Sequence, residues 1–109
     1  NYTEILTQIQ TRLPQTDVYL MAYYPVNETD KIPDGEWGKT LFVNRNNHNI
    51  PIANTEIQKL AKTFGFHYIN VNAGLTDERG MLKKEYTVEG VHMYANAYQI
   101  ILKNMKPYL

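Results

Sequence analysis

The stretch DVYLMAYY, residues 17–24, decides the fold class of this chain. It is short, continuous and apolar, which is typical of a strand in a parallel sheet whose two faces are both buried. A second stretch of this kind, FHYINV at residues 66–71, follows after a predicted helix. Two buried strands joined through a helix predict a parallel pair with a right-handed crossover. The expected fold class is therefore α/β.

Three helices are predicted from apolar residues that recur at helical spacing. The first opens with a capping-box pattern, in which Asn1 is followed three residues later by Glu4. Gly65 stands where the second helix needs a left-handed cap, and Pro107 ends the third. The predicted helices cover residues 1–13, 53–64 and 94–105.

Composition excludes several classes of function. The chain has 109 residues, the size of one domain, and its 11 basic and 11 acidic side chains give a formal net charge of zero. Without a basic stripe we expect no nucleic-acid partner, and the apolar stretches are too short for a membrane span. The sequence contains no cysteine and no serine, so a thiol nucleophile and the commonest hydroxyl nucleophile are both missing.

A long irregular stretch, residues 26–49, follows the first predicted strand and holds the only tryptophan, Trp37. A loop of this length is either functional, for example a substrate-facing lid, or a plain surface excursion, and the sequence leaves both open. Asn27 lies just after the strand, at the edge where open α/β sheets bind ligands. It is a candidate substrate-side residue, with a turn-forming asparagine as the alternative.

The tetrad Glu-Gly-Val-His, residues 89–92, is a candidate catalytic pair. An acid three residues before a histidine, across a glycine-containing turn, can accept a hydrogen bond from the Nδ1–H of the imidazole. The carboxylate then fixes the tautomer and leaves Nε2 of His92 free to take a proton from a hydroxyl. The alternative is an ordinary helix N-terminus, with Glu89 near the positive end of the dipole and His92 solvated.

No other group competes strongly with this tetrad. A Glu-x-x-His metal site needs a second copy on a helix and further glutamates, so we expect neither a metal nor another cofactor. His67 lies inside the second predicted strand, where a lone histidine is usually structural. His48 lies among asparagines in the long loop and is expected to be solvent-exposed.

Residues 85–109, EYTVEGVHMYANAYQIILKNMKPYL, resemble the C-terminal part of the GDSL, or SGNH, family of ester hydrolases. Members of that family commonly show a Thr-x-Asp-Gly-x-His-Leu stretch, then an Asn, a Gly-Tyr pair and a terminal helix. Glu89 stands here for the usual aspartate, and Ala97 stands for the glycine. The resemblance extends upstream over residues 17–27 and 52–72. The positions that fall on the family pattern are Thr87, Gly90, Val91, His92, Asn96 and Tyr98.

The resemblance implies the C-terminal half of a three-layer α/β/α, flavodoxin-like hydrolase domain. His92 is then the general base and acid, and Glu89 its orienting carboxylate. The substrate would be a carboxylic ester or an acetylated sugar. The family's Gly-Asp-Ser and Gly-x-Asn-Asp stretches, which carry the nucleophile and the oxyanion hole, precede the helix matched by residues 1–13 and do not occur in this sequence.

Several expectations follow from that absence. The chain alone should be inactive, because it lacks the family's nucleophile. Its two strands leave unpaired edges, which recruit partners. We therefore expect it to bind the N-terminal half of the same domain or to form a homodimer. The alternative is that the chain is a non-catalytic α/β binding or assembly module.

Overall fold

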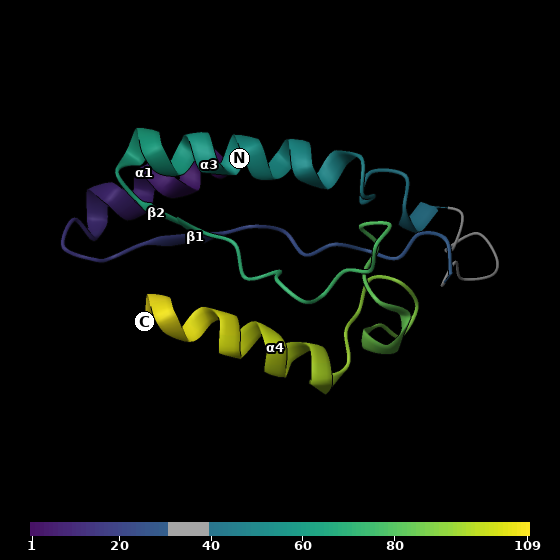
Figure 1. Ribbon diagram of the computed structural model, residues 1–109. Helices are drawn as coiled ribbons and strands as arrows, with labels where there is room; N and C mark the ends of the chain where they lie inside the picture. Colours follow the sequence, from purple (N-terminus) through teal and green to yellow (C-terminus); the bar gives the residue numbers. More distant parts are fainter. Residues whose placement is uncertain (31–39) are drawn as a thin grey trace.

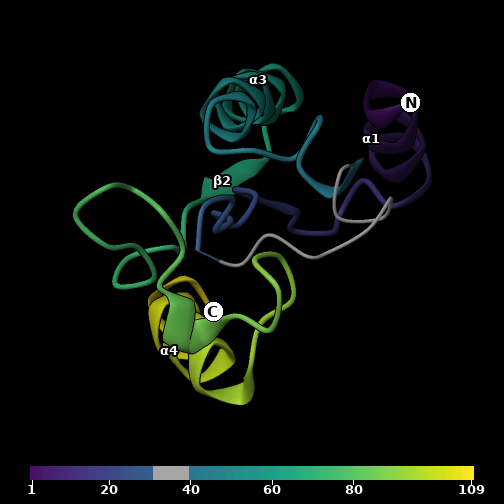
Figure 2. The same ribbon diagram turned by 90° about the vertical axis from the view of Figure 1, so that its right-hand side faces the viewer.

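The computed structural model describes residues 1–30 and 40–109, so the middle of the long loop and Trp37 lie outside the described residues. The described part forms three layers, with two parallel strands between helices (Figure 1). Helices α1 and α3 cover one face of the strands, and α4 lies on the opposite face, as the turned view also shows (Figure 2). This arrangement confirms the predicted α/β class. In chain order the main elements are α1 (Tyr2–Arg12), β1 (Tyr19–Met21), α3 (Asn49–Phe64), β2 (His67–Ile69) and α4 (Ala95–Met105).

The two strands pair in parallel, as predicted, with Tyr19 opposite His67 and Met21 opposite Ile69. Each strand has three residues, shorter than the predicted ranges 17–24 and 66–71. The expected burial of the first strand on both faces is also wrong, because Tyr19 is 39% exposed and Tyr23, just beyond the strand, is 52% exposed.

The first strand is short because asparagine side chains bind the backbone that follows it. The Tyr23 N–H donates to Asn54 Oδ1 over 2.7 Å, and Asn72 Nδ2 donates to the Tyr23 carbonyl over 2.9 Å. Asn47 binds both backbone groups of Val26, accepting from its N–H and donating to its carbonyl. These amides satisfy the polar groups of an extended segment that pairs with no strand among the described residues.

The helix ends follow local chemistry. The capping box of Asn1 and Glu4 is present at the start of α1, and Gly65 adopts φ 71° as the left-handed cap of α3, so both predictions are confirmed. However, α3 begins at Asn49 rather than at residue 53. His48 is its N-cap residue, and Asn46 Oδ1 accepts the N–H groups of His48 and Asn49 over 3.1 and 2.9 Å at the start of the helix. Within residues 1–30 and 40–109, no helix is long and apolar enough to cross a membrane.

Two apolar clusters fill the spaces between the three layers. Adjacent strand residues point to opposite faces, so each layer of helices meets its own cluster. The turn between β2 and α4 belongs to the core as well, because it places two fully buried leucines against α4. This turn therefore gives a rigid base to the residues that follow it. The cluster under α1 and α3 contains Leu6, Leu20, Ile57 and Ala61. The cluster over α4 contains Ile69, Val71, Leu75, Leu82, Ala97 and Ile101.

Candidate active site

The tetrad of residues 89–92 forms the tip of a tight turn just before α4. Thr87 and Met93 pair across the base of this turn in an antiparallel bridge, and the Val88 N–H donates to the His92 carbonyl over 2.8 Å. Since α4 begins at Ala95, the tetrad precedes the helix and does not form its first turn. The helix N-terminus alternative therefore does not describe this segment.

Thr87 holds the turn together from inside. Its side chain is completely buried, and its hydroxyl donates to the His92 carbonyl over 2.8 Å while it accepts the Gly90 N–H over 2.9 Å. Gly90 has φ 112°, in the region that side chains other than glycine rarely adopt. The bridge of Thr87 and the conformation of Gly90 bring the two ends of the tetrad together.

Glu89 and His92 point toward each other, with Glu89 Oε2 2.7 Å from His92 Nδ1. This distance lies within the range of about 2.6–3.2 Å expected for an acid and base pair. The other carboxylate oxygen, Oε1, accepts the backbone N–H groups of Val91 and His92 over 2.8 and 2.6 Å. One carboxylate thus fixes both the backbone and the ring of the histidine.

The electrostatics of the pair determine which ring nitrogen is free. Burial acts to raise the pKa of Glu89, but hydrogen bonds from the His92 backbone, the His92 ring and Val91 outweigh it, so the pKa lies below its ordinary value. An ionised carboxylate can only accept hydrogen bonds, so Nδ1 carries the proton. In the neutral ring Nε2 is then an acceptor, and the His92 side chain is 69% exposed. The arrangement can take a proton from a hydroxyl presented from outside.

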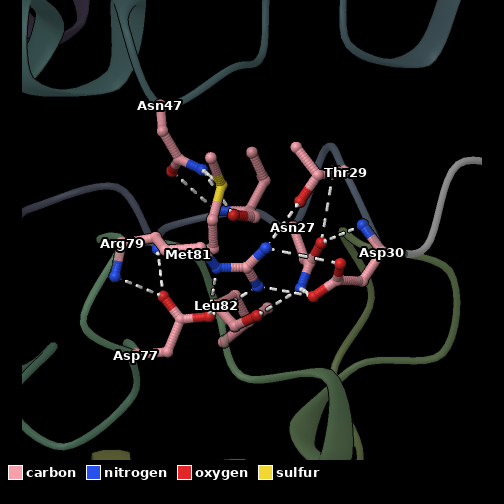
Figure 3. A network of polar contacts seen from close by, with 9 residues as sticks. Asn27, Thr29, Asp30, Asn47, Asp77, Arg79, Met81 and Leu82 are labelled. Atoms are coloured by element: carbon pink, nitrogen blue, oxygen red, sulfur yellow. Dashed lines mark hydrogen bonds and ion pairs between the residues drawn. The ribbon is translucent and has the colours of Figure 1, made fainter.

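Asn27 occupies a different kind of position from the exposed ring of His92. It is completely buried, and its Nδ2 donates to the Leu82 carbonyl over 2.8 Å while its Oδ1 accepts the Asp30 N–H over 2.7 Å (Figure 3). Its own backbone N–H donates to the carbonyl of Gly90 over 2.8 Å. This placement favours the turn-forming role over contact with a substrate, and it links the loop after β1 to the tetrad.

The other two histidines lie elsewhere. The ring of His67 stacks on Tyr19 with centroids 4.6 Å apart, which is a structural contact on the sheet. His48 is exposed, as predicted. Among the described residues, no group of three or more histidine, aspartate or glutamate side chains is arranged to hold a metal ion.

Sequence reasoning missed Asp30 and Arg79, which join the loop after β1 to the turn between β2 and α4 (Figure 3). The stretch TDERG, residues 76–80, signals a turn, and Asp77 Oδ1 accepts the Arg79 N–H as such a turn requires. Nothing in the sequence pairs Arg79 with Asp30, because the two residues are 49 positions apart.

An open pocket of about 490 Å³ adjoins the tetrad through Val91. Its walls are mainly apolar and come from the loop after β1 and the first turns of α3. The residues that form these apolar walls are Tyr23, Tyr24, Pro25, Val26, Ile50 and Ala53. A group bound there would lie beside the residue that precedes His92.

The solved structures that are similar to this chain include three bacterial proteins. A provisionally named platelet activating factor from Streptococcus pneumonia has 30% sequence identity and a TM-score of 0.84 over 98% of this chain. An acylhydrolase from Bacteroides fragilis NCTC 9343 has 15% identity and a TM-score of 0.70, and a GDSL-like lipase from Bacteroides thetaiotaomicron VPI-5482 has 19% identity and a TM-score of 0.68, each over 98% of this chain. The chain spans about half the length of these proteins, 48%, 49% and 49% respectively.

Searches of protein-family models and of curated proteins give no match to this chain. The structural matches nevertheless confirm the resemblance to GDSL-like lipases and acylhydrolases inferred from residues 85–109. The chain has the α/β fold of about half of such a protein.

Proposed function

We propose that this chain supplies the histidine and its orienting carboxylate to a GDSL/SGNH-type serine ester hydrolase. The observation that carries the proposal is the 2.7 Å contact between Glu89 Oε2 and His92 Nδ1, made in a fold shared with GDSL-like hydrolases. The exposed ring of His92 supports it further, because a general base must be reachable by the group that it deprotonates.

In this proposal His92 Nε2 removes the proton of a serine hydroxyl as that oxygen attacks the ester carbonyl. His92 then returns the proton to the departing alcohol, which leaves an acyl-enzyme. A water molecule, deprotonated by the same nitrogen, then attacks the acyl carbon. The bond to the serine oxygen breaks, His92 returns the proton to that oxygen, and the carboxylic acid is released. Glu89 stays ionised throughout and stabilises the imidazolium that forms in each step.

Glutamate replaces the aspartate usual in the family without loss of reach. Both oxygens of Glu89 are engaged, one by the ring of His92 and one by the two backbone N–H groups that follow. The extra methylene is taken up within the turn, where the Glu89 side chain is 18% exposed. We therefore assign Glu89 the orienting role.

The nucleophile in this proposal comes from residues other than these 109, because the sequence contains neither serine nor cysteine. The same residues would supply the oxyanion hole. The chain alone is then inactive, and the rest of the domain, or a second copy of the chain, covers the edge of β1 that faces away from β2. The substrate is a carboxylic ester or an acetylated sugar.

The decisive experiment uses the full-length protein, with whatever residues flank this chain. Hydrolysis of a short nitrophenyl ester is measured for the wild type, His92→Ala, Glu89→Gln and His48→Ala. We expect His92→Ala to lower kcat by roughly 10³-fold or more, and Glu89→Gln to lower it by as much or less. His48→Ala is the control. It removes an exposed histidine that is distant in sequence from His92, and it should keep wild-type turnover.

Labelling with a fluorophosphonate, which reacts with activated serines, provides an independent readout. Labelling of the wild type that is lost in His92→Ala supports the proposal. Full esterase activity in a folded His92→Ala variant would refute the role of His92. No turnover and no labelling in the full-length wild type would favour the alternative of a non-catalytic binding or assembly module.

A further inference from the structure

The geometry points to Asn27, held in place by Asp30 and Arg79, as a positioning residue for the turn that carries Glu89 and His92. This inference rests on the proposed function, since it concerns the same histidine. It assigns a role to residues that touch neither the ring of His92 nor the carboxylate of Glu89.

Asn27 meets the turn through its backbone. Its N–H donates to the Gly90 carbonyl over 2.8 Å. The Cα of Gly90 lies so close to the Asn27 carbonyl that a side chain at position 90 would collide with it. The peptide of Asn27 is therefore packed and hydrogen-bonded against the residue that follows Glu89, and a shift of Asn27 moves the tip of the turn.

The side chain of Asn27 fixes that peptide to the core. Nδ2 donates to the Leu82 carbonyl over 2.8 Å, and Leu82 itself is completely buried. The Leu82 N–H in turn donates to the Val26 carbonyl over 3.0 Å. Two hydrogen bonds thus join residues 26–27 to Leu82. Because of them, Asn27 holds Gly90 in a fixed position relative to the buried segment that contains Leu82.

Arg79 belongs to the same network (Figure 3), and its side chain is partly exposed. Its Nη2 lies 2.5 Å from Asp30 Oδ2 and 2.8 Å from Asp77 Oδ2. These hydrogen bonds hold the pKa of both carboxyls below their ordinary values. Asp30 is held in this way while its N–H donates to Asn27 Oδ1, so Arg79 limits the motion of the loop that presents Asn27.

The exposed fractions of Asn27 and of the Arg79–Asp30 ion pair predict which of the two matters more for the position of the turn. Asn27 is completely buried, whereas the side chains of Arg79 and Asp30 are 46% and 34% exposed. A partly exposed ion pair is weakened by solvent and salt, whereas buried amide hydrogen bonds are not. Loss of the Asn27 amide should therefore disturb the turn more than loss of the Arg79 guanidinium.

The test measures the ring of His92 directly by ¹⁵N NMR of the full-length protein. In the wild type we expect a protected, downfield Nδ1–H and the Nδ1–H tautomer. Asn27→Ala should lose this signal and the tautomer preference, and Arg79→Met should weaken them. Asn104→Ala is the matched control, because Asn104 Nδ2, like Asn27 Nδ2, donates to the backbone; its acceptors are the carbonyls of Val71 and Ala73. It should leave the His92 ring as in the wild type.

Asn27→Asp extends the test, because it keeps the oxygen that accepts from Asp30 and loses the donor to Leu82. If Asn27→Ala does not fold, the NMR measurement is made on Asn27→Asp and Arg79→Met. A wild-type tautomer and Nδ1–H signal in these folded variants would overturn the inference, even if His92→Ala is inactive. Conversely, the full-length protein could lack esterase activity while the Asn27 variants still disturb the His92 ring. That result would refute the proposed reaction but support the positioning role of Asn27.

Discussion

Replacing Gly90 with alanine should destabilise the protein and displace the turn that carries His92. Gly90 has φ 112° and is buried. A Cβ at this position would collide with the Asn27 carbonyl oxygen and lie 2.7 Å from Cζ of Phe42. The phenyl ring can shift, but the carbonyl belongs to a backbone that is hydrogen-bonded on several sides.

Two contributions determine how much Gly90→Ala lowers the free energy of unfolding. An L-residue at such a φ costs about 1–3 kcal/mol in backbone strain. Moving the Asn27 peptide away also breaks the 2.8 Å bond from Asn27 N–H to the Gly90 carbonyl, which contributes about 1 kcal/mol. We therefore expect Gly90→Ala to lower the free energy of unfolding by about 2–4 kcal/mol.

Gly80→Ala is the control, because Gly80 also has a positive φ, 79°, but a Cβ there meets nothing within 4 Å. It should cost about 1–2 kcal/mol, from backbone strain alone. Urea unfolding at one protein concentration, followed by circular dichroism, gives both values. Equal losses in the two variants would show that the close approach of Gly90 to Asn27 does not matter, and the account of the turn would be wrong.

Three further predictions concern the same region. Thr87→Val should cost about 1–3 kcal/mol and speed hydrogen exchange at the Gly90 amide, because the buried Gly90 N–H loses its acceptor. Glu89 has a lowered pKa, so the stability that it contributes is complete above the ordinary glutamate pKa and is lost as the pH falls through the lowered value. The stability difference between the wild type and Glu89→Gln, measured by urea unfolding across acidic pH, should therefore shrink as the pH falls. Leu75→Ala should cost about 2–5 kcal/mol by urea unfolding, since Leu75 is completely buried, while the His92 tautomer seen by NMR stays unchanged.

The helices could be predicted closely because their ends depend on residues near in sequence. Asn1 with Glu4, and Gly65, are caps that act within one turn, and each is found where it was expected. The start of α3 was missed because the side chain of Asn46, within the predicted loop, holds the backbone of the N-cap residue and of the first helical residue. One such asparagine among several others has no distinguishing signal in the sequence.

The strands were predicted in type and direction but not in length. Apolar character alone marked residues 17–24 as a strand, yet pairing ends at Met21. Beyond it, Asn54 and Asn72 satisfy the backbone of Tyr23 from distant parts of the chain. Hydrophobic pattern reports what is buried, whereas the end of a ladder depends on which polar group reaches the backbone first.

The candidate site divides in the same way between near and distant contacts. Glu89 and His92 are three residues apart, so their contact could be inferred from spacing and a glycine between them. Asn27 was noticed for its place after a strand, but its buried hydrogen bonds with Leu82 and Gly90 come from chain folding. The contact between Arg79 and Asp30 was missed because the two residues lie 49 positions apart in the sequence.

The difference between contacts inside the turn and contacts from distant residues determines how activity would arise under the proposed function. The hydrogen bond that orients His92 is made inside one tight turn, and the contacts that hold the turn come from residues 27, 82 and 87 of the same chain. The base and its carboxylate therefore need nothing from outside the chain to take up their geometry. What the sequence lacks is a serine for Nε2 to deprotonate. Binding of the segment that carries the serine should thus switch on turnover without rearranging the ring of His92, and the His92 NMR signals should be nearly the same before and after that segment binds.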